Sequence, residues 1–257
     1  MRPPMNLIRN TPLPAVPEGI RRVRVLVAGA TGVVGESVLM QLAAQPRVAQ
    51  VGLLVQRMAP LAIRRVLGVE ADPAGPQAWL RPPASEGVIL FERPRRLRRQ
   101  DKNALRIKPQ QLIEIARWMR DCGVLRLLVV LPQDPWRLPG ATRRGLEQLN
   151  PQDLGALGFE SVLIVHGARA AVTGTQRAFW RRAADPVLGA LGRLLPPRQQ
   201  PLMVERIACL ATALLEQAPR GLHEIKPELV WEAGHGEPET VLTRWLHGLA
   251  PVPDHAA

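Results

Sequence analysis

Two kinds of hydrophobic pattern alternate along the chain from residue 23 onward. Short runs of apolar residues, rich in Val, Leu and Ile, indicate strands that are buried on both faces of a sheet. Between several of them, apolar residues recur every three or four positions, which indicates helices with one buried face. The predicted strands are 23–28, 48–55, 63–69, 87–91, 124–131 and 161–165. The predicted helices are 36–43, 107–122, 141–149, 201–217 and 237–249, with a short apolar segment at 222–225.

Three glycines separate the first predicted strand from the first predicted helix, in the order Gly-Ala-Thr-Gly-Val-Val-Gly from residue 29. Gly29 permits a tight turn, Gly32 lets the backbone approach a pyrophosphate, and Gly35 lets the helix pack against the strand. The N–H groups at the start of the helix then face the anion. We therefore expect this loop to bind a dinucleotide. The expected cofactor-binding residues in it are Gly29, Thr31, Gly32, Val33, Val34 and Gly35.

The alternation of strands and helices around this loop predicts an α/β fold. We expect a doubly wound, mostly parallel sheet of the Rossmann type with a small C-terminal region on the substrate side. Residues 1–21 are predicted to form a proline-rich arm. Residues 22–230 are predicted to form the NAD(P)-binding domain with its substrate-side elements, and 231–257 a C-terminal helix and tail. The 205–215 helix could cover the sheet or form the seam of a homodimer.

The end of the second strand bears on the choice of cofactor. An acidic residue there would accept a hydrogen bond from the ribose of NAD, whereas an arginine can pair with the 2′-phosphate of NADP. The chain has Gln56 and Arg57 at this point and no acid. NADP(H) is therefore preferred to NAD(H).

The composition gives the chain a strong positive charge. The net charge is +12, from 34 basic and 22 acidic residues, but the arginines are spread along the chain and only Arg93–Arg99 forms a cluster. Few aromatic residues lie beside the cluster to stack on bases, which disfavours nucleic acid as a partner. The two cysteines and five histidines have no spacing typical of a metal site.

Hydrophobic length and the N-terminal composition bear on location. The apolar runs are too short to span a bilayer, and the proline-rich start does not read as a secretory signal. We expect a cytoplasmic protein that makes no membrane contact.

Four stretches together resemble the atypical short-chain dehydrogenase/reductase superfamily: 29–35, 54–57, 121–130 and 156–160. The most similar branch holds bacterial NAD(P)-binding oxidoreductase-like proteins and the Tat-interacting tumour-suppressor protein. The resemblance covers roughly residues 22–225. It implies a parallel doubly wound sheet, an NADP(H) site along the carboxyl ends of the strands, and a smaller C-terminal region on the substrate side.

The catalytic groups typical of that superfamily are missing. Its members use a Tyr, a Lys four residues later, and a Ser after the fifth strand, but this chain contains no Tyr, and Gly140 stands where the resemblance places it. Arg144 could keep a positive charge near the ribose. His166, after the sixth strand, and Asp134, after the fifth, are candidate substitute acids. For His166 the alternative is a hydrogen-bonded structural role.

Three functions stay open at this point. The first is an NADP(H)-binding protein with little or no standard dehydrogenase activity, acting as a cofactor sensor or scaffold. The second is an NADPH-dependent oxidoreductase or isomerase that uses a non-standard acid such as His166 on an unidentified small molecule. The third is polyanion or nucleic-acid binding through Arg93–Arg99. Residues 58–105 could also fill the cleft and leave the glycine loop without a ligand.

Overall fold

A computed structural model describes residues 22–58, 63–72, 74–92, 104–132, 145–146, 149–166, 170–171 and 202–248. The main sheet consists of β1 (Val23–Ala28), β2 (Val48–Val55), β3 (Val66–Glu70), β4 (Glu86–Leu90), β5 (Arg126–Leu131), β6 (Ser161–His166) and β9 (Gly221–Ile225). A second, two-stranded sheet pairs β7 (Ala170–Ala171) with β8 (Leu202–Met203). The helices are α1 (Val33–Ala44), α2 (Leu112–Asp121), α4 (Pro151–Gly155), α6 (Val204–Gln217), α7 (Pro227–His235) and α8 (Pro238–Leu246), with a 3₁₀ turn, η2 (Pro109–Gln111).

The main sheet runs in the order β3-β2-β1-β4-β5-β6-β9, and every adjacent pair of its strands is parallel. The order reverses direction between β1 and β4, because the chain first winds outward to β3 and then returns to the other side of β1. A doubly wound α/β sheet places its ligand crevice at such a reversal, outside the carboxyl ends of the strands. The predicted fold class is confirmed.

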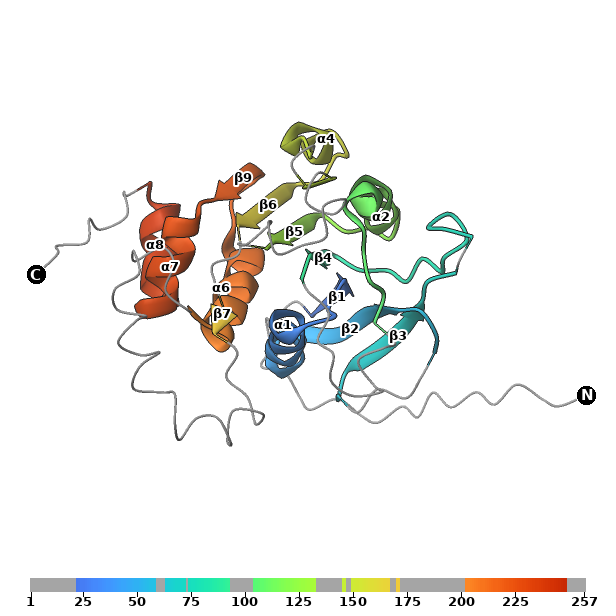
Figure 1. Cartoon of the computed structure of the whole chain (residues 1–257), viewed down its shortest axis with the longest axis horizontal. Helices are drawn as coiled ribbons and strands as arrows, with labels where there is room; N and C mark the ends of the chain where they lie inside the picture. Colours follow the sequence, from blue (N-terminus) through green and yellow to red (C-terminus); the bar gives the residue numbers. More distant parts are fainter. Residues whose placement is uncertain are drawn as a thin grey trace, which may run out of the picture.

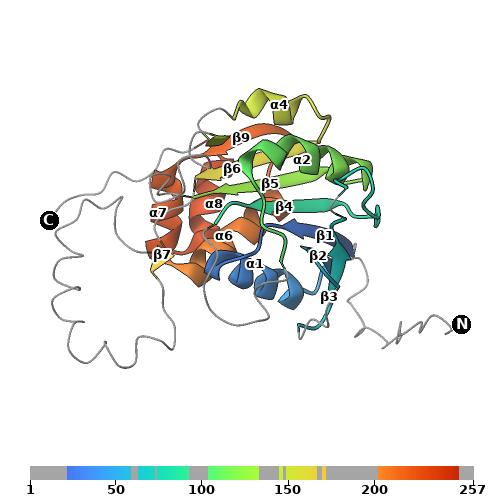
Figure 2. The same cartoon turned by 45° about the vertical axis from the view of Figure 1, so that its right-hand side comes forward.

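Helices cover both faces of this sheet (Figures 1 and 2). α1 and α6 lie side by side on one face, with α7 and α8 beyond α6, while α2 and α4 lie on the other. A hydrophobic core lies on each face of the sheet, and successive residues of β1 point into one core and then the other. Val25 and Val27 pack toward α1 and α6, whereas Leu26 and Ala28 pack toward α2. A strand buried on both faces needs apolar residues at every position, which is why the strands read as continuous hydrophobic runs.

Several element boundaries differ from the prediction. β3 begins at Val66, and the helix predicted from 107 begins at Leu112 after η2. Lys108 is extended, with ψ 148°, because the following Pro109 disfavours helical geometry in the residue before it. α7 was not predicted at all. The arm at 1–21 and most of the helix predicted over 141–149 lie outside the described residues.

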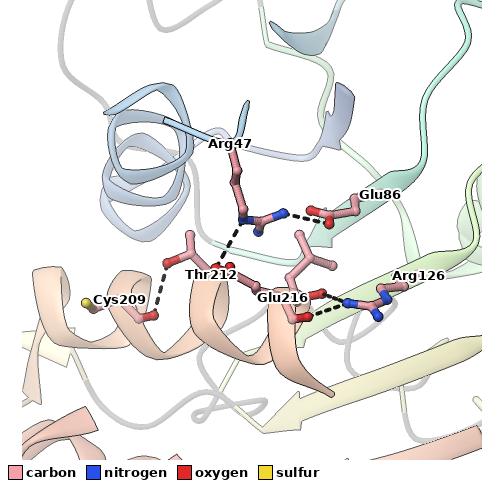
Figure 3. Close-up of polar contacts among 7 residues, drawn as sticks. Arg47, Glu86, Arg126, Cys209, Thr212 and Glu216 are labelled. Carbon is pink, nitrogen blue, oxygen red and sulfur yellow. Dashed lines mark hydrogen bonds and ion pairs between the residues drawn. The ribbon is translucent and has the colours of Figure 1, made fainter. Parts of the chain in front are cut away.

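Charged side chains join four segments at the amino ends of the strands, namely β4, β5, α6 and the residues between α1 and β2 (Figure 3). Arg47, between α1 and β2, donates from Nη1 to Oε1 of Glu86 at 2.7 Å, and its Nε lies 3.1 Å from Oε2 of Glu216 on α6. Arg126 of β5 donates to the carbonyl oxygens of Leu215 and Glu216, the two residues that precede the last residue of α6. A cation there offsets the negative end of the helix dipole. Burial raises the pKa of Glu86, and Arg47 opposes that rise.

A cavity of about 490 Å³ lies beside these charges and is lined in part by Arg47, Glu86 and Arg126. It is at the opposite edge of the sheet from the glycine loop, because Glu86 and Arg126 are the first residues of their strands. In the part of the chain that the structure describes, we find no helix with the length and apolarity needed to cross a bilayer.

Candidate functional site

The glycine loop lies where the sheet reverses its order, between the carboxyl ends of β1 and β4. α1 begins at Val33, and Gly32 precedes it in an extended conformation. Gly29 has φ +82°, and a Cβ built on it would lie 2.0 Å from the carbonyl oxygen of Leu90 in β4. Only glycine fits a backbone that is both left-handed and this close to the next strand. The spacing of the motif is thus explained by the turn out of β1.

The loop's N–H groups already hold an anion, the side chain of Glu92. Oε1 of Glu92 accepts from the backbone N–H of Gly32 at 2.8 Å and of Gly35 at 2.9 Å, and Oε2 accepts from the N–H of Val34 at 3.1 Å. The first N–H groups of a helix have no partner within the helix and carry its positive dipole end, so they attract an anion. In this structure a carboxylate of the chain itself supplies that anion.

The register of the sheet explains how Glu92 arrives there. Ala28 of β1 pairs with Ile89 of β4, so the residues just past the two strands lie side by side. The N–H of Phe91 still donates to the carbonyl oxygen of Val130, which continues the β4–β5 ladder one residue past β4. Glu92 follows directly, and its side chain is the first past that ladder to face the loop.

Gly35 leaves the space that this contact needs, because it has no side chain. A Cβ at this position would lie 2.4 Å from Oε1 of Glu92 and 2.5 Å from Cα of Ala30. Real Cβ atoms do not approach other atoms so closely. Glycine at the third position of the motif therefore allows both the backbone at Ala30 and the carboxylate of Glu92 to lie against the start of α1.

The electrostatics of Glu92 are set by two opposing effects. Burial raises its pKa from 4.5 to about 7, although the hydrogen bonds from Gly32, Gly35 and Val34 favour the charged form and lower it. With a pKa near 7, the carboxyl group is divided between its charged and neutral forms at neutral pH. Protonation therefore favours the buried position of the group, and ionisation as the pH rises through about 7 disfavours it.

Sequence reasoning did not single out Glu92. The residue directly follows the predicted fourth strand and directly precedes the arginine cluster, which is the more conspicuous feature of this stretch. The available signal was an acidic residue at the carboxyl end of a strand expected beside the glycine loop. The end of the second strand is where an acidic residue selects the cofactor in this fold, and the end of the fourth strand lies at the same edge of the sheet.

His166 has a carboxylate partner. It is the last residue of β6, and its Nε2 lies 2.6 Å from Oε1 of Glu224 on β9, the next strand. The side chains of His166 and Glu224 are 37% and 56% exposed, so the imidazole is accessible to solvent. A carboxylate that binds one ring nitrogen fixes the orientation and tautomer of the ring. Both the structural role and the role of proton donor expected for His166 are compatible with this pair.

The other predicted residues contribute less. Arg57 is exposed just past the carboxyl end of β2, where it was expected. The N–H of Thr31 donates to the carbonyl oxygen of Gly29 within the turn. Asp134, Arg144 and the cluster Arg93–Arg99 lie outside the described residues.

Two further kinds of chemistry find no support in the described part of the chain. The residues whose positions are given contain no group of three or more His, Cys, Asp or Glu side chains that could hold a metal ion. Cys122 is buried, and burial raises the pKa of its thiol to about 11. A thiol of this kind is an inert core residue rather than a nucleophile.

No protein-family model matches the chain, and no curated protein matches it. Among solved structures, it is similar to the Bordetella bronchiseptica enzyme WbmG in complex with NAD, with 14% identity, a TM-score of 0.48, and coverage of 87% of this chain and 82% of the other. It is also similar to the PhqB reductase domain from Penicillium fellutanum, with 16% identity, a TM-score of 0.48, and coverage of 91% and 87%. A third is an NADPH-dependent quinone oxidoreductase from Escherichia coli, with 13% identity, a TM-score of 0.48, and coverage of 79% and 67%. These likenesses lie at the level of the fold, which in this chain is the doubly wound Rossmann fold.

Proposed function

We propose that this protein binds a nicotinamide dinucleotide on its glycine loop and has little or no standard dehydrogenase activity, acting as a cofactor sensor or scaffold. The observation that carries the proposal is the occupied loop. The N–H groups of Gly32, Val34 and Gly35 converge on one carboxylate, so the loop is already folded as an anion-binding site. The same donors, at the same place in this fold, are the ones that a pyrophosphate uses.

The lack of standard chemistry follows from composition. The chain contains no Tyr, so the phenol that exchanges a proton with substrate in the superfamily it resembles is absent. Loss of a general acid typically costs about 10²- to 10⁴-fold in rate. The cofactor supplies the hydride when it is bound, and the protein's part would be to position it.

We further propose that NADP(H) binds in preference to NAD(H). Arg57 is exposed past the end of β2, and no acidic residue stands at 56 or 57 to accept from a ribose hydroxyl. An arginine at this position suits a 2′-phosphate, because a guanidinium binds phosphate oxygens with paired hydrogen bonds.

The pairing of His166 with Glu224 favours one alternative, an oxidoreductase or isomerase with a non-standard acid. The pair is exposed at the carboxyl edge of the sheet, the edge at which this fold binds its ligands. A histidine oriented by a carboxylate is a typical general acid or base in catalysis. In this alternative, His166→Ala abolishes turnover of a carbonyl substrate and leaves dinucleotide affinity unchanged.

Calorimetric titration with NADPH, NADP⁺, NADH and NAD⁺, up to millimolar concentrations, tests the proposed function. We expect NADPH to bind and Gly32→Asp to abolish the binding, because the new carboxylate lies on the loop. Gly155→Asp is the matched control: it introduces the same charge on α4, where a Cβ has room. Absence of binding in the wild type and in Glu92→Gln alike contradicts the proposal. Equal affinities for NADPH and NADH contradict the cofactor preference alone.

A further inference from the structure

We propose that Glu92 is an internal competitor for the dinucleotide phosphate, and that its carboxylate must leave the glycine loop before a dinucleotide binds. The inference rests on the proposed function and adds a residue that sets the affinity of the site. In this view the structure shows the closed form of the loop. Dinucleotide binding is an exchange of one anion for another.

The donors of the loop cannot serve two anions at once. The N–H groups of Gly32 and Gly35 both point to Oε1 of Glu92, and that of Val34 points to Oε2. A phosphate oxygen that accepted from any of them would have to occupy the space of a carboxylate oxygen. Two negative groups at that separation would also repel each other strongly. Occupation by Glu92 and by phosphate therefore exclude each other.

The exchange does not require the sheet to open. The β4–β5 ladder continues through Phe91, whose N–H bonds Val130, and Glu92 is the first residue past it. In this proposal the carboxylate leaves the loop by rotation about the side-chain bonds of Glu92, with the β4–β5 ladder intact. The three N–H groups exchange one set of charge-assisted hydrogen bonds for another, so Glu92 lowers the apparent affinity of the loop for a phosphate by competition, although the two never occupy the loop together.

The competitor also selects the kind of ligand. Only a ligand that brings an anionic group, such as a phosphate or pyrophosphate, can replace the lost hydrogen bonds at the loop, so a neutral ligand gains nothing from removal of Glu92. Inorganic pyrophosphate is therefore a sufficient probe of the loop. NADPH probes the loop and the rest of the crevice together.

Titration of NADPH and of inorganic pyrophosphate into four proteins at pH 7.5 tests the inference. These are the wild type, Glu92→Gln, Glu92→Ala and Glu160→Gln. Glu92→Gln keeps the size of the side chain and removes its charge, and Glu92→Ala removes the competing group. Glu160→Gln removes the same charge from the other edge of the sheet, before β6, where Glu160 lies 3.7 Å from Arg220. This variant measures how much the loss of one negative charge, by itself, raises the affinity of the protein for an anion.

We expect both Glu92 variants to bind both probes at least tenfold more tightly than the wild type, with Glu160→Gln within about threefold of it. Wild-type affinity equal to that of both Glu92 variants overturns the inference and leaves the proposed function standing. An equal gain in Glu160→Gln also overturns it, because the effect is then one of net charge. Should Glu92→Ala fail to fold, Glu92→Gln decides alone. If no protein binds either probe, the proposed function fails and the inference fails with it.

Discussion

Replacement of Glu92 by glutamine should change how the stability of the protein depends on pH. In the unfolded chain this carboxyl group ionises near its ordinary pKa of 4.5, and in the folded protein near 7. Between these values the folded protein holds a proton that the unfolded chain has released. Folding stability therefore falls as the pH rises through this range, and the loss is complete above pH 7. Glutamine cannot ionise, so the variant lacks this dependence.

The size of the effect follows from the two pKa values. A pKa difference of one corresponds to about 1.36 kcal/mol, so the rise from 4.5 to about 7 corresponds to about 3 kcal/mol. Below pH 4.5 both states of the wild type carry a neutral carboxyl group, and Glu92→Gln and the wild type should be of similar stability. At pH 8 the variant should be more stable by about 3 kcal/mol.

Urea denaturation of the wild type, Glu92→Gln and Glu160→Gln at pH 5, 6, 7 and 8 measures the effect. The quantity of interest is the difference in unfolding free energy between variant and wild type at each pH. It should grow steadily with pH for Glu92→Gln and stay nearly constant for Glu160→Gln, whose carboxylate is exposed. A difference for Glu92→Gln that is the same at pH 5 and pH 8 would refute the reasoning, because the carboxylate would then be no more costly to ionise in the folded protein.

Three further substitutions have defined outcomes. Arg47→Met leaves the carboxylate of Glu86, 5% exposed, without its cation, and should cost about 3–5 kcal/mol of unfolding free energy in urea; a loss below about 1 kcal/mol would contradict a buried ion pair. Gly35→Ala forces a Cβ to within 2.5 Å of Cα of Ala30 and should cost about 1–3 kcal/mol by thermal melting, with Gly155→Ala, which has room, as the tolerated comparison. His166→Ala removes an ion pair that is largely open to solvent, so melting should show a loss below about 1 kcal/mol, and a loss above 2 kcal/mol would make the histidine a structural residue.

The sheet could be predicted from the sequence more fully than its helices. β1 and β2 match the predicted ranges because strands buried on both faces leave an uninterrupted apolar run that polar residues do not break. α7 escaped prediction because few of its apolar residues are fully buried, namely the adjacent pair Leu229 and Val230 and then Ala233. A single pair followed by Ala233 is too little to define a helical period.

Half of the candidate site could be predicted in the same way. The glycine loop was found because the requirement for glycine is local: the turn at Gly29 and the tight contact at Gly35 lie within one strand–turn–helix unit. Glu92 lies 57 to 60 residues away from the N–H groups it binds. Only the pairing of β1 with β4 brings it there, and no periodicity in the sequence records that pairing. Whether Gly29 to Gly35 and Arg57 bind a cofactor remains a prediction.

The charges at the amino edge of the sheet also bear on how the chain is completed during synthesis. Glu86 and Arg47 are made early, but Glu216, which completes their cluster, follows Glu86 by 130 residues. At a synthesis rate of about 5–20 residues per second, the two early residues wait roughly 7–26 s for the third. During that interval α6 is absent, and the face of the sheet that α6 later shares with α1 is only partly covered. Until α6 is made, the apolar residues that later pack against it lack that cover, and we expect the nascent chain to be most prone to aggregate in this interval.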